Sequence, residues 1–229
     1  MTSTAENKAD IALGIIPNGI GNDFASYWGL DNDDYKKAVD WIINRRLRKI
    51  DVGRVGYTDG DVCGTRYFVN AMYIGLGARF VWISNGTRRF WEMQWLSFLS
   101  SMFLLLFERK LHRMHIKVNG EHIRDRIMTI CIGSARGYGL TPSAVPYNGW
   151  LDVSVVYRPE LMQLLKGLWL LVQGRLLNLR QVVKPYRTRK VKILRAQNAA
   201  ISLDGRQLYK ECPLDVRIMP EVLSLIIPN

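Results

Sequence analysis

The chain contains, at residues 11–25, the stretch Ile-Ala-Leu-Gly-Ile-Ile-Pro-Asn-Gly-Ile-Gly-Asn-Asp-Phe-Ala. Its first six residues form an almost continuous apolar run, which predicts a buried strand. The loop that follows contains Gly19 and Gly21, and Asn22 or Asp23 can cap the next helix through a side-chain oxygen. A strand, a glycine-rich loop and a helix in this order indicate an α/β unit. Because glycines let a backbone approach a ligand closely, this loop is a candidate phosphate site, although a simple capped turn explains the same residues.

Beyond this unit, a second helix is expected along the apolar stripe from Tyr35 to Leu47, and short runs of strand type follow. The dipeptide Asn119-Gly120 is a strong hairpin signal. The predicted strands are Ile50–Tyr57, Arg66–Ile74, His112–Val118, a run beginning at His122, Ile127–Gly133, Leu151–Tyr157, Lys190–Leu194, Ala199–Leu203, Leu214–Ile218 and Leu223–Ile227. Further helices are predicted over Phe90–Glu108 and Pro159–Leu177. The sequence therefore predicts a mixed α+β fold: an α/β piece over residues 1–50 and an antiparallel β domain over 51–229, with the last strand returning to the first piece.

Composition excludes several protein classes. The chain has 229 residues, of which 48% are hydrophobic and 23% charged, as in an ordinary globular protein, so disorder and collagen are excluded. Cys63, Cys131 and Cys212 are odd in number and widely spaced, which excludes a disulfide framework or a paired-cysteine metal site and predicts inert core thiols. Residues 1–10 have no apolar signal segment, and a cytoplasmic location is expected.

Basic residues outnumber acidic ones, and the excess is unevenly placed. The formal net charge is +12, with 15 basic and 12 acidic groups in residues 1–115 against 17 and 8 in residues 116–229. The segment from Lys184 to Arg195 contains six basic groups and no acid. Such a field favours a polyanion, either nucleic acid, nucleotide phosphates or an anionic membrane. A solvated charged face is the simpler alternative.

Two other features have alternative explanations. The predicted helix Phe90–Glu108 is apolar nearly all round with basic ends, so it either packs on the β domain, which we favour, or dips into a membrane interface. His112, His115 and His122 match no zinc-binding spacing and are expected to be solvated or edge histidines.

The glycine loop carries a resemblance to a known family. Residues 17–25 closely resemble the P-x-G-T-x-N-D-F-A segment of the diacylglycerol kinase and sphingosine kinase family, whose bacterial lipid kinases are the most similar. The similarity continues in order through Ile50-Asp51-Val52-Gly53, Phe68-Val69-Asn70, Gly75-Leu76-Gly77, Gly149-Trp150-Leu151-Asp152-Val153 and Leu203-Asp204-Gly205. It implies ATP-dependent phosphorylation of a lipid hydroxyl with Mg²⁺, a partial nucleotide domain related to NAD kinase, and a β-sandwich that receives the lipid.

The resemblance also implies site residues and partners. Gly19, Gly21, Asn22 and Asp23 would bind the nucleotide, Asp152 would bind the metal, and Asp204 would be catalytic. From the residues alone, both aspartates are equally explained as turn residues. The expected partners are a diacylglycerol-like lipid, an anionic surface at the inner face of the membrane and a second copy of the chain in a homodimer. Nucleic acid is not expected.

The chain departs from the family pattern in ways that bear on activity. No GGDGT phosphate loop is present, so the chain resembles a member without its first roughly one hundred residues. Three motif positions also differ: Ile20 replaces a threonine, Arg79 an acid, and Asn148 an aspartate. Arg206 replaces the glutamate that resembles a general base, and a guanidinium cannot accept a proton. A truncated or weakly active lipid kinase is therefore expected, and the alternative is a non-catalytic lipid- or membrane-binding module.

Overall fold

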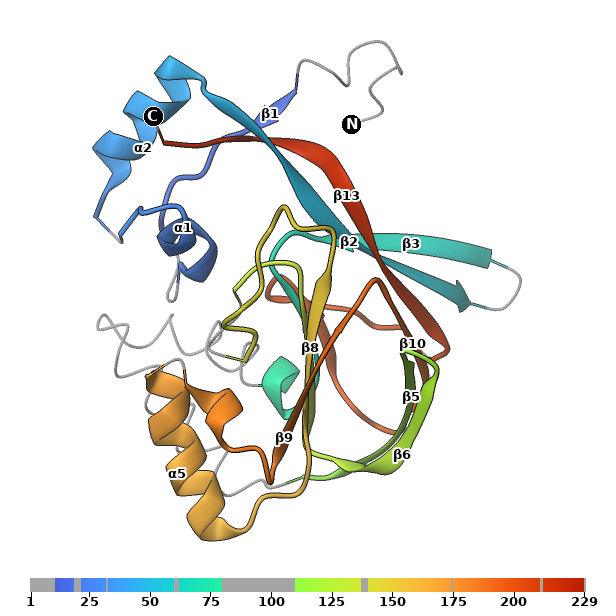
Figure 1. Ribbon diagram of the computed structural model, residues 1–229. Coiled ribbons are helices and arrows are strands. Elements are labelled where there is room, and N and C mark those ends of the chain that lie inside the picture. Colours follow the sequence, from blue (N-terminus) through green and yellow to red (C-terminus); the bar gives the residue numbers. More distant parts are fainter. Residues whose placement is uncertain are drawn as a thin grey trace.

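Two stacked β-sheets form the body of the molecule, and a small α/β unit lies at one end (Figure 1). The computed structural model describes residues 11–18, 22–31, 33–59, 62–79, 110–136, 140–173, 175–210 and 212–228. The first sheet contains β1 (Ala12–Leu13), β2 (Leu47–Asp59), β3 (Val62–Phe68), β5 (His112–Val118), β6 (Glu121–Ile127), β10 (Lys190–Ala196) and β13 (Leu214–Ile226). The second contains β4 (Ala71–Gly75), β7 (Thr129–Gly133), β8 (Leu151–Val156), β9 (Val183–Thr188), β11 (Ile201–Leu203) and β12 (Arg206–Gln207). The described helices include α1 (Asp23–Tyr27), α2 (Tyr35–Asn44), α5 (Leu161–Val172), the 3-10 turn η2 (Leu176–Asn178) and a short helical segment over residues 76–79.

The strand order explains how the sequence fills two cores. The first sheet runs β3-β2-β13-β10-β5-β6 and the second β12-β11-β4-β7-β8-β9. Alternate residues of β4 face opposite sides, so Met72 and Ile74 join the core between the sheets. Ala71 and Tyr73 join a second core that includes Leu164 of α5. Because the second sheet is covered on both faces, its central strands are buried at every position. The predicted mixed fold with an antiparallel sandwich is confirmed.

One long strand connects the sandwich with the α/β unit. The predicted strands Leu214–Ile218 and Leu223–Ile227 are a single strand, β13, which pairs with β2 along its length and in parallel with β1. A bulge between Met219 and Leu223 interrupts its register with β2. This bulge contains Pro220, which has no N–H for the ladder, and therefore the alternating pattern is broken there. The division into two strands was wrong for that reason.

The opposite difference occurs at Arg66–Ile74, predicted as one strand. The chain leaves the first sheet after Phe68 and enters the second sheet at Ala71, so this segment forms the separate strands β3 and β4. The hairpin of β5 and β6 forms as predicted, with positive φ angles of 50° at Asn119 and 85° at Gly120. Strand β9 was missed as a separate element, because only its basic character was noted.

The α/β unit is smaller and more exposed than predicted. Strand β1 spans two residues, and Ile11 and Ile16 are 56% and 55% exposed, so the prediction of a buried strand over Ile11–Ile16 was wrong. Within the described residues, β1 has only β13 beside it. In α2 only Ala38 is buried, although the apolar stripe is long. Asn22 stands at the start of α1 without a side-chain capping hydrogen bond, so that expected cap is absent; the Asp23 side chain lies outside the described residues.

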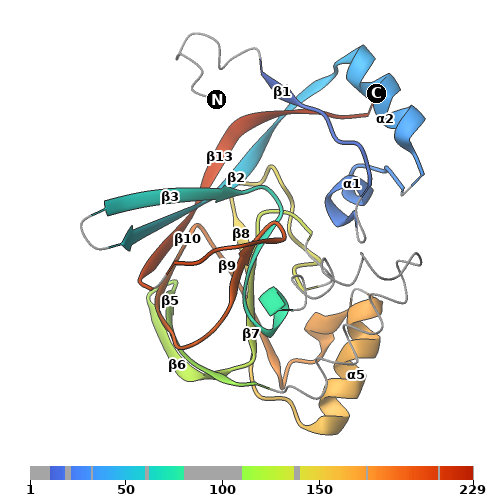
Figure 2. The same ribbon diagram turned by 180° about the vertical axis from the view of Figure 1, so that it is seen from behind.

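Several smaller expectations were corrected or could not be compared. Cys131 is buried and Cys212 is half-buried, but Cys63 is exposed, so not every thiol lies in the core. His112 is buried and its Nδ1 lies 3.1 Å from the Gln197 carbonyl oxygen. The predicted helix Phe90–Glu108 lies outside the described residues. Among the described helices, which include α5 at the end of the molecule opposite α2 (Figure 2), none is long and apolar enough to cross a membrane.

Gly53 gives a direct test of the sandwich packing. It lies opposite Phe68 in the β2–β3 register, and a Cβ added there would collide with the Phe68 ring, which is only 1% exposed. Because the ring is enclosed and cannot move away freely, we expect Gly53→Ala to lower the free energy of unfolding by about 1–3 kcal/mol in urea denaturation.

Gly56→Ala is the matched control on the same strand. A Cβ there meets its nearest neighbour, the Asp215 carbonyl oxygen, at 3.7 Å, which is an ordinary contact. We expect a change smaller than about 1 kcal/mol. Equal effects of the two substitutions would contradict the packing described for Phe68.

Candidate functional site

Aromatic contacts join the helix after the glycine loop to a loop of the sandwich. The Tyr27 hydroxyl donates a hydrogen bond of 3.1 Å to the Tyr147 hydroxyl, and the Trp28 ring lies 6.0 Å from the Tyr147 ring. The Arg48 guanidinium stacks on the same Tyr147 ring at 3.6 Å. Burial, with the Tyr147 hydrogen bond, raises the pKa of Tyr27 to about 12. The α/β unit therefore contacts the sandwich just before β8.

A buried carboxylate fixes this loop. Asp51 in β2 is 0% exposed, and its Oδ2 accepts a hydrogen bond of 2.6 Å from the Gly149 N–H. Its Oδ1 accepts a hydrogen bond of 3.0 Å from the Glu221 N–H in the β13 bulge. The Asp51 N–H donates in turn to the Pro146 carbonyl at 2.7 Å. Since a buried charge needs hydrogen-bond donors, Asp51 holds the bulge and the loop in one arrangement.

Asp152 forms an ion pair at the start of β8. Its side chain is 9% exposed, and its Oδ1 accepts a hydrogen bond of 2.8 Å from Arg187 Nε. Its Oδ2 accepts from the Ser143 hydroxyl at 2.8 Å and from Arg187 Nη2 at 3.3 Å. The Asp152 hydrogen bond and charge raise the pKa of Arg187. Both carboxylate oxygens are thus occupied by protein donors.

Asp204 serves as an acceptor for the chain where it changes sheets. Its Oδ2 accepts a hydrogen bond of 2.6 Å from the Val69 N–H, and its Oδ1 accepts from the N–H groups of Asn70 at 3.0 Å and Ala71 at 2.9 Å. Asp204 and Gly205 have φ angles of 44° and 84°, which places them in a tight turn between β11 and β12. Burial raises the pKa of the Asp204 carboxyl, although the three N–H donors act in the opposite direction. The sheet change at Val69–Asn70 is therefore held from a distant turn.

The register brings the two aspartates to the same end of the second sheet. Ala71, whose N–H binds Asp204, pairs with Gly133, which pairs with Asp152, which pairs with Arg187. Strands β11 and β8 are three positions apart, so the carboxylates are separated by roughly 14 Å at ordinary strand spacing. The two carboxylates thus lie at the same end of the sheet but not in contact with each other.

The structure leaves part of the predicted nucleotide site undescribed. Gly19 and Gly21 lie outside the described residues, and so does the side chain of Asp23. Asn22 is described, with a φ of 44° at the start of α1. The nucleotide roles of these four residues remain predictions.

Among the described residues, Asp152 is paired with a cation and is not part of a group of metal ligands. Mg²⁺ takes oxygen ligands, usually carboxylates and water, whereas both Asp152 oxygens bind Ser143 and the cation Arg187. In the described part of the chain, no three His, Cys, Asp or Glu residues are grouped as metal ligands would be. The metal role of Asp152 stays a prediction, and we derive no chemical step through a metal.

Sequence reasoning missed several residues that shape the site. Asp51 and Asn70 were noted only within the resemblance, and Arg187 only as part of a basic run. Asn70 Oδ1 is buried and finds no hydrogen-bond partner among the described residues, beside the chain segment that binds Asp204. The signal for Asp51 was a carboxylate inside an apolar strand, which implies a buried polar partner. The partner of Arg187 could not be found in the same way, because it is 35 residues distant in the chain.

Comparison with known families decides which family this is. Residues 70–227 match the YegS C-terminal NAD kinase beta sandwich-like domain, and residues 1–55 match the diacylglycerol kinase catalytic domain. The chain belongs to the bacterial diacylglycerol kinase and YegS-type lipid kinase family. The family predicted from the sequence is confirmed.

Individual relatives of this lipid kinase family are distant. The chain is 24% identical to a diacylglycerol kinase of Bacillus subtilis (strain 168), over 84% of this chain and 62% of the relative. It is 25% identical to a diacylglycerol kinase of Mycobacterium tuberculosis (strain ATCC 25618 / H37Rv), over 96% of this chain and 70% of the relative. The crystal structure of a diacylglycerol kinase from Bacillus anthracis str. Sterne superposes with a TM-score of 0.61 at 14% identity, over 95% of this chain and 67% of that one, and supports the fold. The chain thus spans less than two thirds of the first curated relative.

The departures from the lipid kinase pattern have definite places. Arg206 is exposed in β12, next to the Asp204 turn. Asn148 accepts a hydrogen bond of 2.9 Å from the Trp150 N–H through its side chain, so it closes the turn before β8. Arg79 is half-buried, shortly after the end of β4.

Asp51 gives the sharpest test of the site's architecture. In Asp51→Asn, one oxygen is replaced by an NH₂ group that faces an N–H donor and carries no charge. Because a buried hydrogen bond to a charged group contributes about 1.5–3 kcal/mol, we expect a loss of that order in urea denaturation.

The control is Asp215→Asn, the same chemical change at a partly exposed ion pair. Asp215 binds Lys190 and Arg217 at the surface, and we expect a loss of at most about 1 kcal/mol. If Asp51→Asn were no more harmful than Asp215→Asn, the role assigned to Asp51 would be wrong.

Proposed function

We propose that this chain takes part in ATP-dependent phosphorylation of a lipid hydroxyl, with a diacylglycerol-like lipid as acceptor. The observation that carries this proposal is the match of both family domains in order, over residues 1–55 and 70–227. Family relatives named diacylglycerol kinase support a phosphotransferase, and the name implies ATP as the phosphate donor. In this proposal the sandwich receives the lipid, and residues 19–23 form part of the nucleotide wall.

The described residues support positioning roles. Tyr27, Trp28 and Tyr147 pack α1, which follows the glycine loop, against the loop that leads to β8. Asp51 keeps that loop in register with β13. Phosphoryl transfer depends on positioned groups more than on covalent chemistry by the protein, and these contacts provide such positioning. Asp204, for which we propose a catalytic role, accepts a hydrogen bond from the Asn70 N–H, and the Asn70 side-chain oxygen has no hydrogen-bond partner among the described residues.

The second candidate function is a non-catalytic lipid- or membrane-binding module. Three observations favour it: Asp152 is paired with Arg187, Asp204 binds three main-chain N–H groups, and Arg206 replaces an expected base. The 229 residues also contain no GGDGT loop. We therefore propose that the 229-residue chain by itself is at most weakly active.

ATP binding distinguishes the two candidates. Ile20 stands where the family has a threonine, so the chain lacks one hydroxyl that can bind phosphate or water. A single hydrogen bond contributes about 1 kcal/mol, and we expect Ile20→Thr to lower the Kd for ATP–Mg²⁺ about fivefold in calorimetric titration.

Ile20→Val is the matched control, because valine has the shape of threonine and no hydroxyl. We expect its Kd to equal that of the unaltered chain. If neither the unaltered chain nor Ile20→Thr binds ATP at millimolar concentration, the nucleotide site is absent and the binding module is the better description.

Phosphate transfer tests the activity directly. The purified 229-residue chain is supplied with labelled ATP, Mg²⁺ and diacylglycerol in mixed micelles. We expect turnover well below about 1 s⁻¹, the low end of ordinary enzymes, because the phosphate loop and the expected base are missing. Turnover at or above that rate would show that the chain needs neither.

A further inference from the structure

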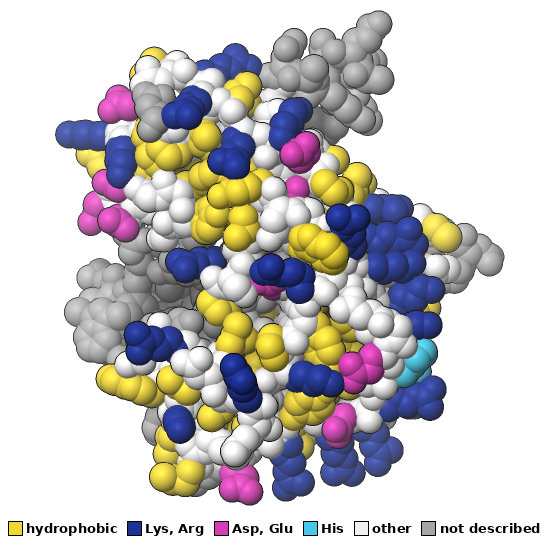
Figure 3. Space-filling model, in the orientation of Figure 1, with side chains coloured by type: hydrophobic (Ala, Val, Ile, Leu, Met, Phe, Trp, Pro, Cys, Tyr) yellow, Lys and Arg dark blue, Asp and Glu magenta, His cyan; other side chains and the backbone are white. Residues whose placement is uncertain are grey.

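The outward face of the first sheet is strongly basic. Residues directly opposite on neighbouring strands share a face, so the register identifies which side chains lie together. On β2, β13, β10, β5 and β6 this face presents Arg54, Arg113, Lys117, Arg124, Arg126, Lys190, Lys192, Arg195 and Arg217, with His115 and His122. Figure 3 shows Lys and Arg side chains gathered on the side of the molecule where β5, β6 and β10 lie. We call these residues the basic face.

One acid, Asp215, lies in these rows of paired residues. Its carboxylate binds Arg217 through two hydrogen bonds of 2.8 and 3.0 Å, and lies 3.2 Å from the Lys190 ammonium. The Arg217 hydrogen bond lowers the pKa of Asp215, and the Lys190 bond adds to this. Asp215 thus neutralises charge at Lys190 and Arg217 and forms no ion pair with the other described cations of the basic face.

Lys117 and Lys192 form a like-charged pair. They are direct neighbours across β5 and β10, and in the described part of the chain neither takes part in an ion pair. Like charges directly opposite each other on a sheet are destabilising. An anion placed between the two ammonium groups would convert this repulsion into attraction.

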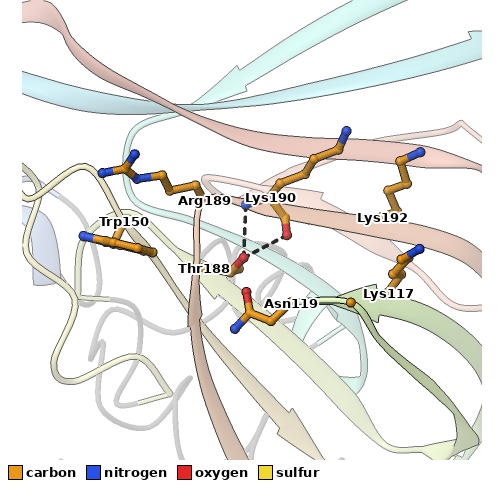
Figure 4. Close-up of a pocket in the computed structure, with 8 residues that line it drawn as sticks. Lys117, Asn119, Trp150, Thr188, Arg189, Lys190 and Lys192 are labelled. Atoms are coloured by element: carbon orange, nitrogen blue, oxygen red, sulfur yellow. Dashed lines mark hydrogen bonds between the residues drawn. The ribbon is translucent and has the colours of Figure 1, made fainter.

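The paired lysines open onto a pocket of about 550 Å³ (Figure 4). The side chains of Lys117, Lys190 and Lys192 extend next to one another along one side of the pocket. Opposite them, the Arg189 guanidinium stacks on the Trp150 ring at 4.7 Å. A pocket of this volume accommodates a small polar ligand, and clustered lysines bind phosphate as point charges.

The pocket adjoins the Asp152–Arg187 ion pair of the candidate site. Trp150 stands just before β8, two residues before Asp152, and Arg189 lies in the β9–β10 turn, two residues after Arg187. Residues two apart in a strand are about 7 Å apart. A phosphate in the pocket would therefore lie next to the start of β8.

We propose that this pocket binds the phosphate of an anionic phospholipid headgroup, and that the basic face docks on an anionic membrane. The inference rests on the proposed function, since a diacylglycerol-like acceptor lies in a bilayer. Trp150 is 38% exposed at the pocket rim, as suits a side chain at the headgroup level of a membrane. Nucleic acid is disfavoured, because Arg189 covers a face of the ring on which a base would stack.

Vesicle flotation of the 229-residue chain tests the proposal. The vesicles contain phosphatidylcholine alone, or phosphatidylcholine with phosphatidic acid or phosphatidylserine at matched surface charge. We expect binding to both anionic mixtures, lost at high salt, and tighter binding to phosphatidic acid, whose phosphate monoester can enter the pocket. The double variant Lys117→Gln/Lys192→Gln should lower the partition coefficient on phosphatidic acid about 30-fold and remove the preference for that lipid.

Two matched variants separate the pocket from general charge. Arg113→Gln/Arg126→Gln removes the same charge from the basic face away from the pocket, and should weaken binding to both anionic lipids equally. Lys36→Gln/Lys49→Gln, which we call the α/β-unit variant, removes the same charge from α2 and from the start of β2 beside the α/β unit, and should change binding less than about twofold. Thermal unfolding confirms that each variant is folded, as expected for exposed side chains.

Several results would overturn the proposal. One is that the pocket variant and the α/β-unit variant lower binding equally, and another is that the chain binds neutral and anionic vesicles equally. The others are full release from vesicles by millimolar inorganic phosphate, and tighter binding to an oligonucleotide than to anionic vesicles. Flotation requires no ATP, so its failure leaves the kinase proposal standing. A failed kinase assay would equally leave the docking result unchanged.

Discussion

The hydrogen bonds of the Asp51 carboxylate are the constraint on which the arrangement of the site depends. A buried charge is tolerated only where donors surround it, and here the donors come from the loop before β8 and from the bulge of β13. Strand β2, the bulge and the loop must therefore come together for any one of them to be stable. The same loop carries Tyr147, on which α1 and Arg48 pack. The position of α1 relative to the sandwich thus depends on the loop that this one carboxylate fixes.

A carboxylate also holds the chain at its other change of direction, where Asp204 accepts hydrogen bonds from the main chain. Three consecutive N–H groups would lose their ladder partners where the chain leaves β3 for β4, and the carboxylate supplies an acceptor for each. Asp204, which resembles a catalytic acid of the family, therefore also stabilises the change of sheet. Asp152, held by Arg187 and Ser143, is a third case. These hydrogen bonds give Asp152 and Asp204 structural roles in addition to the roles that the resemblance implies for them.

Local patterns predicted much of the fold, and long-range partners account for what was missed. The β5–β6 hairpin and strand β8 followed from turn residues and apolar alternation within a few positions. The division of Arg66–Ile74 depends on Asp204, which is 133 or more residues away, and no local signal marks it. Likewise, the bulge in β13 made one strand look like two in the sequence. The bulge is held by Asp51, which is 170 residues distant from Glu221. The motifs drew attention to Asp152 and Asp204, but the groups that hydrogen-bond to these two carboxylates could not be predicted from their neighbours in sequence.

The basic surplus of residues 116–229 has a structural explanation that composition alone does not provide. Alternation in β5, β6 and β10 directs one set of side chains into the core and the other onto a single outward face, so cations distant in sequence become neighbours. Their mutual repulsion is relieved by one acid, Asp215, at one side, and remains at Lys117 and Lys192. A fold that concentrates like charge beside a pocket, two residues from the Asp152–Arg187 pair, favours an anion there over plain solvent. Docking through this face would bring a bilayer close to the start of β8, where Asp152 lies, and would connect the charge of the molecule with the lipid acceptor that we propose.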